Sequence, residues 1–317
     1  MIDLKIFSRR RDKFLSQLKG RAAVVPAASM VVHHADCDFP FRQDSDFWYL
    51  TGFDEPDAVA LFLPYRKEGE RFVLFVNPRE PGQEVWHGAL WGTEGAVSNF
   101  GAEIAHPLTE FSQRLKWYLK GAESIVFRVG KHPKIESIVL QAWSEQLEQS
   151  PRSGLSPLTL EAPCPILHQM RLLKEPNELD RMREAARISG EAHELARNAA
   201  CPGLNERSLQ GLIEQHFLDQ GARGPAYGSI VAGGDNACVL HYTANSALLK
   251  DGDLLLIDAG CSLDDYYNAD ITRTFPINGT FSGEQLALYE VVLAAQKEAI
   301  SWILPGHNAE AVHAKAV

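Results

Sequence analysis

The fold of the second half of the chain is predicted from one stretch, Asp253-Leu-Leu-Leu-Ile-Asp258-Ala-Gly-Cys-Ser-Leu-Asp-Asp-Tyr-Tyr-Asn-Ala-Asp270-Ile-Thr-Arg-Thr-Phe-Pro276. An apolar run ends at Asp258, and the alternation after Asp270 is typical of a strand with one buried face. The polar residues between them predict a turn. The sequence therefore predicts two antiparallel strands that place two carboxylates side by side, where one divalent cation could bind both.

A second hairpin is predicted just upstream, over residues 229–242. Gly233-Gly-Asp-Asn236 is its expected turn, and residues 238–242 are its expected returning strand, which carries His241 towards the carboxylates. A histidine there could hydrogen-bond a substrate carbonyl or the oxyanion of a tetrahedral intermediate. Simpler interpretations stay open: an aspartate that bonds its own turn, a salt bridge from Arg273 to either aspartate, and a histidine with structural contacts only.

The two halves of the chain differ in pattern. Residues 1–165 mix strand-like and helix-like segments, and Gln149–Pro165, which is rich in Ser and Pro, is expected to be a linker. Residues 166–317 begin with a long helix, predicted from Asn177 to Ala200 with Asn177 as its N-cap. A chain of 317 residues is long enough for two cores. The sequence therefore predicts a two-domain protein of the α+β or α/β class.

One short motif occurs twice in the second half. Pro202-Gly-Leu-Asn205 ends the first long helix. Pro305-Gly-His-Asn308 ends a later helix, which starts at Ser282 with Gln285 in a predicted capping box. Each asparagine is expected to cap the next helix. This echo indicates an internal duplication, of which the 317 residues hold one copy and part of another.

Composition argues against several classes of partner. The formal net charge of −10 makes nucleic acid and an anionic membrane surface poor partners.

The five cysteines are odd in number and include no close pair, which favours reduced thiols over a disulfide framework or a zinc ribbon. The arginines at 9–11 are not followed by an apolar segment, so no secretion signal or membrane anchor is predicted. A cytoplasmic location is expected.

Motifs in both halves together resemble aminopeptidase P, one of the pita-bread metallopeptidases. In the second half they are His241-Tyr-Thr243, Leu256-Ile-Asp-Ala-Gly260 and Asp270-Ile-Thr-Arg-Thr-Phe-Pro276. In the first half they are Phe41-Arg-Gln-Asp-Ser-Asp-Phe-Trp-Tyr-Leu-Thr-Gly-Phe53 and Glu84-Val-Trp-His-Gly88. The resemblance implies a creatinase-like N-terminal domain over residues 1–165 and a partial pita-bread catalytic domain over residues 166–317.

The resemblance also implies an activity. Aminopeptidase P removes the first residue of a peptide whose second residue is proline, with two divalent cations, usually Mn²⁺, that activate a water. It implies that Asp258 binds one metal, that Asp270 bridges both, and that His241 acts on the substrate. Tyr227 and Trp86 are expected at the substrate site, Trp86 in that of a neighbouring subunit, so a homo-oligomer is expected.

The chain departs from the family pattern in two ways. It has one extra residue in the turn near Asp264 and Asp265. The other family ligands, one His and two Glu, come later in that pattern, so these 317 residues are expected to supply two of five ligands and to be inactive alone. The strands of residues 229–276 are expected to leave apolar surface uncovered, which favours poor solubility or dimerisation. Two alternatives stay open: prolidase, which cuts Xaa-Pro dipeptides, and a non-catalytic peptide-binding module of the same fold.

Overall fold

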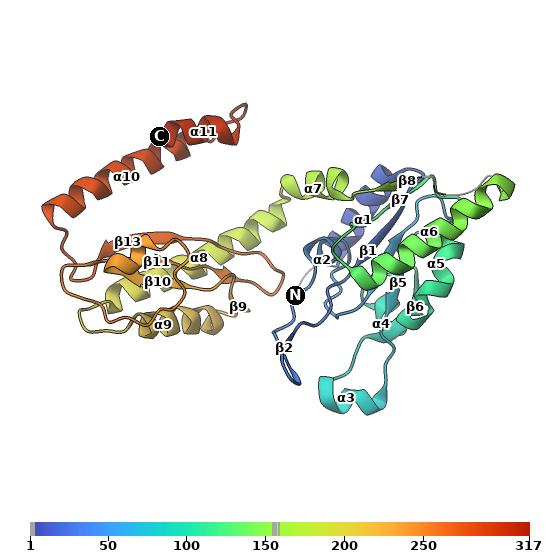
Figure 1. Cartoon of the computed structure of the whole chain (residues 1–317), viewed down its shortest axis with the longest axis horizontal. Helices are drawn as coiled ribbons and strands as arrows, with labels where there is room; N and C mark the ends of the chain where they lie inside the picture. The colour runs from blue at the N-terminus through green and yellow to red at the C-terminus, as the bar shows by residue number, and fades with distance from the viewer. Residues whose placement is uncertain (1–3, 154–156, 158) are drawn as a thin grey trace. The chain divides into compact units, whose positions relative to one another are not determined.

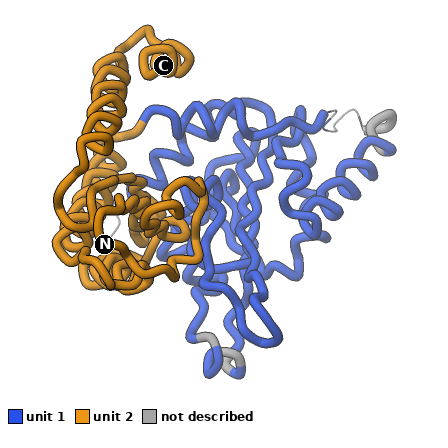
Figure 2. Tube along the Cα trace, turned by 60° about the vertical axis from the view of Figure 1, so that its left-hand side comes forward, with its two compact units in different colours: residues 1–173 blue, residues 174–317 orange. Residues whose placement is uncertain are grey.

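A computed structural model describes residues 4–153, 157 and 159–317. The chain folds into two compact units, residues 1–173 and 174–317 (Figure 2). The first unit ends at Leu173, and the domain boundary predicted at residue 165 stays a prediction. Within the described residues, no helix combines the length and the apolar character needed to cross a bilayer.

Unit 1 is built on a six-stranded mixed sheet with the order β6-β5-β4-β1-β7-β8 (Figure 1). The central pairs β1–β4 and β4–β5 are antiparallel, and the outer pairs β5–β6, β1–β7 and β7–β8 are parallel. The strands are β1 (Ala22–Pro26), β4 (Val59–Phe62), β5 (Phe72–Val76), β6 (Ile104–Pro107), β7 (Ser124–Val126) and β8 (Thr159–Glu161). A separate small hairpin consists of β2 (Val32–His34) and β3 (Cys37–Asp38).

Alternate residues of the central strands fill two cores, one on each face of this sheet. On β1, Ala23 and Val25 join the core that includes Phe14 of α1, whereas Ala22 and Val24 join the core that includes Phe111 of α5. The helices are α1 (Lys5–Leu18), α2 (Ser45–Thr51), α3 (Pro81–His87), α4 (Gly92–Ser98), the 3₁₀ turn η1 (Leu108–Glu110), α5 (Phe111–Leu119), α6 (Pro133–Ser153) and α7 (Cys164–Leu172).

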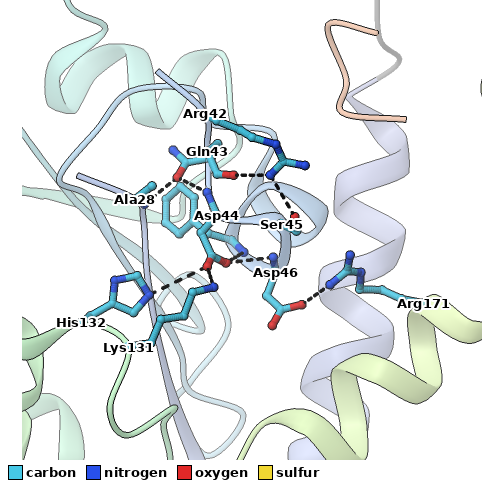
Figure 3. Close-up of polar contacts among 10 residues, drawn as sticks. Ala28, Arg42, Gln43, Asp44, Ser45, Asp46, Lys131, His132 and Arg171 are labelled. Carbon is cyan, nitrogen blue, oxygen red and sulfur yellow. Dashed lines mark hydrogen bonds and ion pairs between the residues drawn. The ribbon is translucent and has the colours of Figure 1, made fainter. Parts of the chain in front are cut away.

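The motif of residues 41–53 builds a buried polar network around α2 (Figure 3). Gln43 Oε1 accepts hydrogen bonds from Ala28 N at 2.7 Å and Asp44 N at 2.8 Å, and its Nε2 donates to the carbonyls of Phe53 and Glu55. Asp44 caps α2 and pairs with Lys131. Asp46 pairs with Arg171 of α7 at 2.5 Å. The described contacts of this motif are therefore structural.

Unit 2 packs two helices against one face of a three-stranded antiparallel sheet. The sheet order is β10 (Ile230–Gly233), β11 (Leu254–Asp258) and β13 (Thr272–Pro276), and a second ladder pairs β9 (Gly224–Pro225) with β12 (Cys261–Ser262). Ile188 of α8 (Pro176–Ala199) and Phe217 of α9 (Glu206–Asp219) share a core with Leu255 and Ile257 of β11. The predicted pairing of β11 with β13 is confirmed.

The second occurrence of the Pro-Gly-x-Asn motif also joins two helices. Asn205 accepts a hydrogen bond from Arg207 N, and Asn308 accepts one from Ala311 N, so both asparagines are N-caps as predicted. The capping box of Ser282 and Gln285 is present at the start of α10 (Gly283–Ser301). Neither α10 nor α11 (Ala309–Ala316) has a buried residue. The two copies therefore share local structure and differ in packing, and duplication stays a prediction.

Three local predictions were wrong. The expected linker at residues 149–165 contains the end of α6 and strand β8, which extends the sheet beside β7; residues 154–156 and 158 lie outside the described part. The N-cap of α8 is Glu175 rather than Asn177, because Pro176 takes the first helical position and Glu178 completes a capping box. Residues 238–242 are not a strand.

The chain does not turn back on β10 as the sequence predicted. Gly234 has φ +57° and begins the 3₁₀ turn η2 (Gly234–Cys238), and β10 pairs with β11 instead. The segment from residue 234 to residue 246 is thus a loop held by side chains rather than the return of a hairpin.

Candidate active site

Asp258 lies on the sheet face of unit 2 that is turned away from the core. Along β11, Leu255 and Ile257 are buried, whereas Leu254, Leu256 and Asp258 are half-buried. Asp258 is opposite Thr272 in the antiparallel ladder with β13. Asp270 comes two residues before β13 begins and is exposed. Both carboxylates therefore lie at the same end of one strand pair.

The hydroxyl group of Tyr227 joins the two carboxylates. It donates a hydrogen bond to Asp258 Oδ1 at 2.5 Å and lies 3.0 Å from Asp270 Oδ1. The two carboxylate oxygens can be no farther apart than these two distances added together. The structure thus brings three of the sequence-predicted residues to one point, Tyr227, Asp258 and Asp270.

Backbone contacts around Gly260 hold this arrangement. Ala226 N donates to Gly260 O at 2.8 Å, which fixes the neighbouring Tyr227 beside β11. Ala259 N donates to Ile271 O at 3.1 Å, so the ladder continues past Asp258 towards Asp270. A Cβ atom at position 260 would lie 1.9 Å from Ala269 O, so only glycine allows this approach.

The environment keeps Tyr227 protonated. Burial raises its pKa, and the two carboxylates that accept from its hydroxyl raise the pKa further, because a phenolate there would face two negative charges. The single hydroxyl hydrogen is therefore shared between the two aspartates, with the shorter contact to Asp258. The simpler interpretation of Arg273 as their partner is wrong: in the described residues no ion pair joins it to either, and its guanidinium donates to Thr272 O.

His241 lies in the loop that replaces the predicted hairpin. It is exposed, and no hydrogen bond or ion pair involves it within the described residues. The next residue, Tyr242, is tied down, because its hydroxyl donates to Glu206 Oε2 at 2.8 Å. The structure does not bring His241 into contact with either carboxylate.

Trp86 belongs to unit 1, unlike the other candidate residues. It lies on α3, and its side chain is 80% exposed, as is that of Val85 at 84%. A large aromatic side chain with so much exposed surface is more typical of a contact site than of a core.

His193 is a residue that the sequence analysis missed. Its side chain is buried on α8, and its Nε2 lies 3.0 Å from the carbonyl oxygen of Ala259, the residue after Asp258. Because a carbonyl only accepts, Nε2 carries the hydrogen, and burial lowers the pKa of the ring. Its helical spacing with Ser189 and Ala196 on the buried face was the available signal.

Two converging carboxylates are hard oxygen ligands of the kind that divalent cations prefer. Within the described residues, however, no group of three or more His, Cys, Asp or Glu side chains could together hold a metal ion. The donor set therefore fits part of a metal centre. It cannot by itself complete the coordination that a pair of metal ions needs.

Comparison with known proteins identifies the family. Residues 7–127 match the aminopeptidase P N-terminal domain, and residues 180–317 match metallopeptidase family M24. The chain is 39% identical over 302 residues to an Xaa-Pro aminopeptidase of Escherichia coli K12, an alignment that covers 95% of this chain and 68% of the relative. This chain belongs to the aminopeptidase P family. The predicted family and two-domain fold class are thus confirmed.

Solved aminopeptidase P structures agree with this assignment. The aminopeptidase PepP of Pseudomonas aeruginosa matches with a TM-score of 0.94 and 41% identity over 99% of this chain and 71% of that chain. A zinc-substituted E. coli aminopeptidase P in complex with product matches with a TM-score of 0.93 and 37% identity over 99% of this chain and 72% of that chain. The aminopeptidase P family consists of hydrolytic metallopeptidases, which agrees with the carboxylate pair at Asp258 and Asp270.

Proposed function

We propose that this chain forms part of an Xaa-Pro aminopeptidase, which releases the N-terminal residue of a peptide whose second residue is proline. The observation that carries the proposal is the convergence of Asp258 and Asp270 on the hydroxyl of Tyr227, in a chain of the aminopeptidase P family. Divalent metal ions held there would activate the water that attacks the peptide carbonyl.

Each candidate site residue has a separate role in this proposal. Asp258 would be a ligand of one metal ion, and Asp270 would be a ligand shared between two. Tyr227 shares its one hydroxyl hydrogen between the two carboxylates and so offsets part of their mutual repulsion, which keeps their oxygens close together. His241 is exposed and has both nitrogens available, so it hydrogen-bonds the substrate carbonyl as negative charge develops on its oxygen. Trp86 lines the substrate site of a neighbouring subunit.

The remaining features of the proposal concern the cation and the setting. Two Mn²⁺ ions suit a carboxylate site, because Mn²⁺ prefers oxygen ligands and tolerates imidazole. The exposed side chains of Val85 and Trp86 support a homo-oligomer. Five free cysteines support a cytoplasmic location. The net charge of −10 supports peptides, rather than nucleic acid or a membrane surface, as the partners.

The test of the activity is cleavage of an Xaa-Pro-Xaa tripeptide with Mn²⁺ by the natural protein that carries these residues. Asp258→Asn and Asp270→Asn should each abolish release of the first residue. Asp264→Asn is the matched control, because Asp264 is an exposed aspartate of the turn between them. Cleavage confined to Xaa-Pro dipeptides would instead support prolidase. Absence of cleavage together with absence of Mn²⁺ binding would support the non-catalytic module.

For the polypeptide of residues 1–317 alone we propose weak metal binding and no turnover. The reason is that the described residues offer two carboxylates and no larger ligand group. Isothermal titration of this polypeptide with Mn²⁺ should show binding weaker than micromolar that disappears in Asp258→Asn. Micromolar binding at two sites, or turnover of the tripeptide, would contradict this proposal.

A further inference from the structure

A stripe of polar residues on α9 contacts residues 229–247, a segment that includes the loop carrying His241. Glu206, Gln210 and Glu214 are spaced four residues apart and so lie on one face of the helix. Glu214 Oε1 accepts from Ser229 Oγ at 2.9 Å, and Gln210 Oε1 accepts from Asn245 Nδ2 at 2.9 Å. This stripe is separate from the apolar stripe of α9, which enters the core of unit 2.

Glu206 closes both ends of the loop with a single carboxylate. Its Oε1 accepts from Gly233 N at 2.9 Å and from Asn236 Nδ2 at 3.0 Å. Its Oε2 accepts from Tyr242 Oη at 2.8 Å and from Ala247 N at 2.9 Å. Gly233 ends β10 and Ala247 follows the loop, so one side chain fixes the entry, the middle and the exit of the segment 234–246.

Glu206 is fully buried, and its hydrogen bonds stabilise its charged form. Its side chain is 0% exposed. Burial alone would raise the pKa of this carboxyl group, but the hydrogen bonds from Gly233, Asn236, Ala247 and Tyr242 outweigh burial and hold the pKa below its usual value. A buried carboxylate is tolerated only when it is well hydrogen-bonded. Glu206 is therefore charged at neutral pH, and the loop supplies its donors.

Asn245 provides a second attachment at the far side of the loop. It is 1% exposed and has a positive φ of 44°. Its Oδ1 accepts from Val231 N at 3.0 Å, and its Nδ2 donates to Ser229 O at 2.7 Å. The loop is thus bound to β10 and α9, while His241 and the neighbouring Leu240 stay exposed.

We propose that Glu206 is a positioning residue, which holds the loop of residues 234–246 so that His241 is presented to the peptide substrate. This inference rests on the proposed role of His241. Glu206 touches no substrate in this proposal and acts through Tyr242, the residue next to His241. The rigid attachment limits the conformations that the loop can adopt before the substrate binds, which is what preorganisation of an oxyanion contact requires.

The first test is hydrogen exchange, measured by mass spectrometry on the whole chain. In Glu206→Gln an amide nitrogen replaces one acceptor oxygen, so at least one backbone N–H of the loop ends loses its partner. Exchange in residues 234–247 should accelerate about tenfold or more, while exchange in β11 stays within about twofold. Tyr242→Phe removes the hydrogen bond to Glu206 and those that Tyr242 Oη accepts from Asn236 Nδ2 and Ser246 N, so it should accelerate exchange in the same segment. Glu194→Gln, an exposed glutamate of α8, should change neither segment.

The second test is a double-mutant cycle on tripeptide cleavage by the natural protein. Glu206→Gln should lower kcat more than it raises KM, and should cause no further loss once His241→Ala is present. Unchanged loop exchange, equal acceleration throughout unit 2, or additive kinetic losses would each overturn the proposal. Absence of any tripeptide cleavage would refute the proposed function, and the exchange data would still decide whether Glu206 holds the loop.

Discussion

Replacing Gly260 with alanine should separate the two carboxylates, because the added methyl group has no room. Its Cβ would lie 1.9 Å from Ala269 O, 2.4 Å from Ala269 C and 2.9 Å from Asp270 N. These are backbone atoms, so no side-chain rotation can relieve the overlap. The segment that must move carries Asp270. The substitution therefore acts on the candidate metal site through the backbone.

The cost can be worked from the contacts. Overpacking a close-packed site costs about 1–3 kcal/mol, and occasionally more. Moving this segment also strains two backbone hydrogen bonds, Ala226 N to Gly260 O at 2.8 Å and Ala269 N to Cys261 O at 3.0 Å. Each contributes about 1 kcal/mol. We expect Gly260→Ala to lower the free energy of unfolding of unit 2 by about 3–5 kcal/mol.

Gly211→Ala is the matched control. Gly211 lies in the middle of α9, and a Cβ there would meet nothing within 4 Å. Alanine should therefore stabilise the helix by about 0.5–1 kcal/mol. Stability would be measured from the slowest-exchanging amides of β11 in the whole chain, since these report the unfolding of unit 2. A loss of less than about 1 kcal/mol in Gly260→Ala would refute the reasoning, because backbone overlap could not then be present.

Three further substitutions test the polar contacts. Tyr227→Phe should cost about 1–3 kcal/mol at neutral pH. The folded state raises the pKa of Tyr227, so the contribution of this residue to stability is complete below pH about 10 and is lost as pH rises above it. A pH series of urea unfolding should therefore show a smaller alkaline loss of stability in Tyr227→Phe than in the wild type, whose Tyr65 and Tyr118 also have raised pKa values. Glu206→Gln should reduce the loss of stability at acid pH. The folded state lowers the pKa of Glu206, so its carboxylate contributes stability above the unfolded-state pKa of 4.5, and this contribution is lost as pH falls. Thermal melts across pH 3–6 would show the difference. Gln43→Ala should destabilise unit 1 by about 3 kcal/mol or more in urea unfolding, because it leaves buried backbone groups of Asp44 and Phe53 without Gln43 as a partner. An unchanged midpoint would contradict the network.

Patterns among residues close in sequence were sufficient to predict much of the secondary structure of unit 2. The apolar run before Asp258 and the alternation after Asp270 specified β11, β13 and their pairing. The asparagine of the first Pro-Gly-x-Asn motif was correctly predicted as the cap of α9. These signals act between residues close in sequence, so they are visible without the fold.

The loop of residues 234–246 was beyond such signals. Its sequence contains a glycine pair that fits a hairpin turn, and the turn would form if the strand after it had a partner. The carboxylate of Glu206, some thirty residues earlier, instead captures the backbone at Gly233 and Ala247. A contact at that separation leaves no periodic trace in a single sequence. The position of His241 was therefore the least predictable part of the site.

The two Pro-Gly-x-Asn copies separate what local sequence decides from what packing decides. Both have a helix, a break, an asparagine cap and a second helix. In the first copy the apolar face is buried against β11, whereas in the second copy apolar side chains such as Val291 and Ile303 are more than half exposed. Caps and helix-forming residues thus specify where α10 begins and ends. They do not supply the burial that stabilises most helices in proteins, so α10 should exchange its amides faster than α8 in the same molecule.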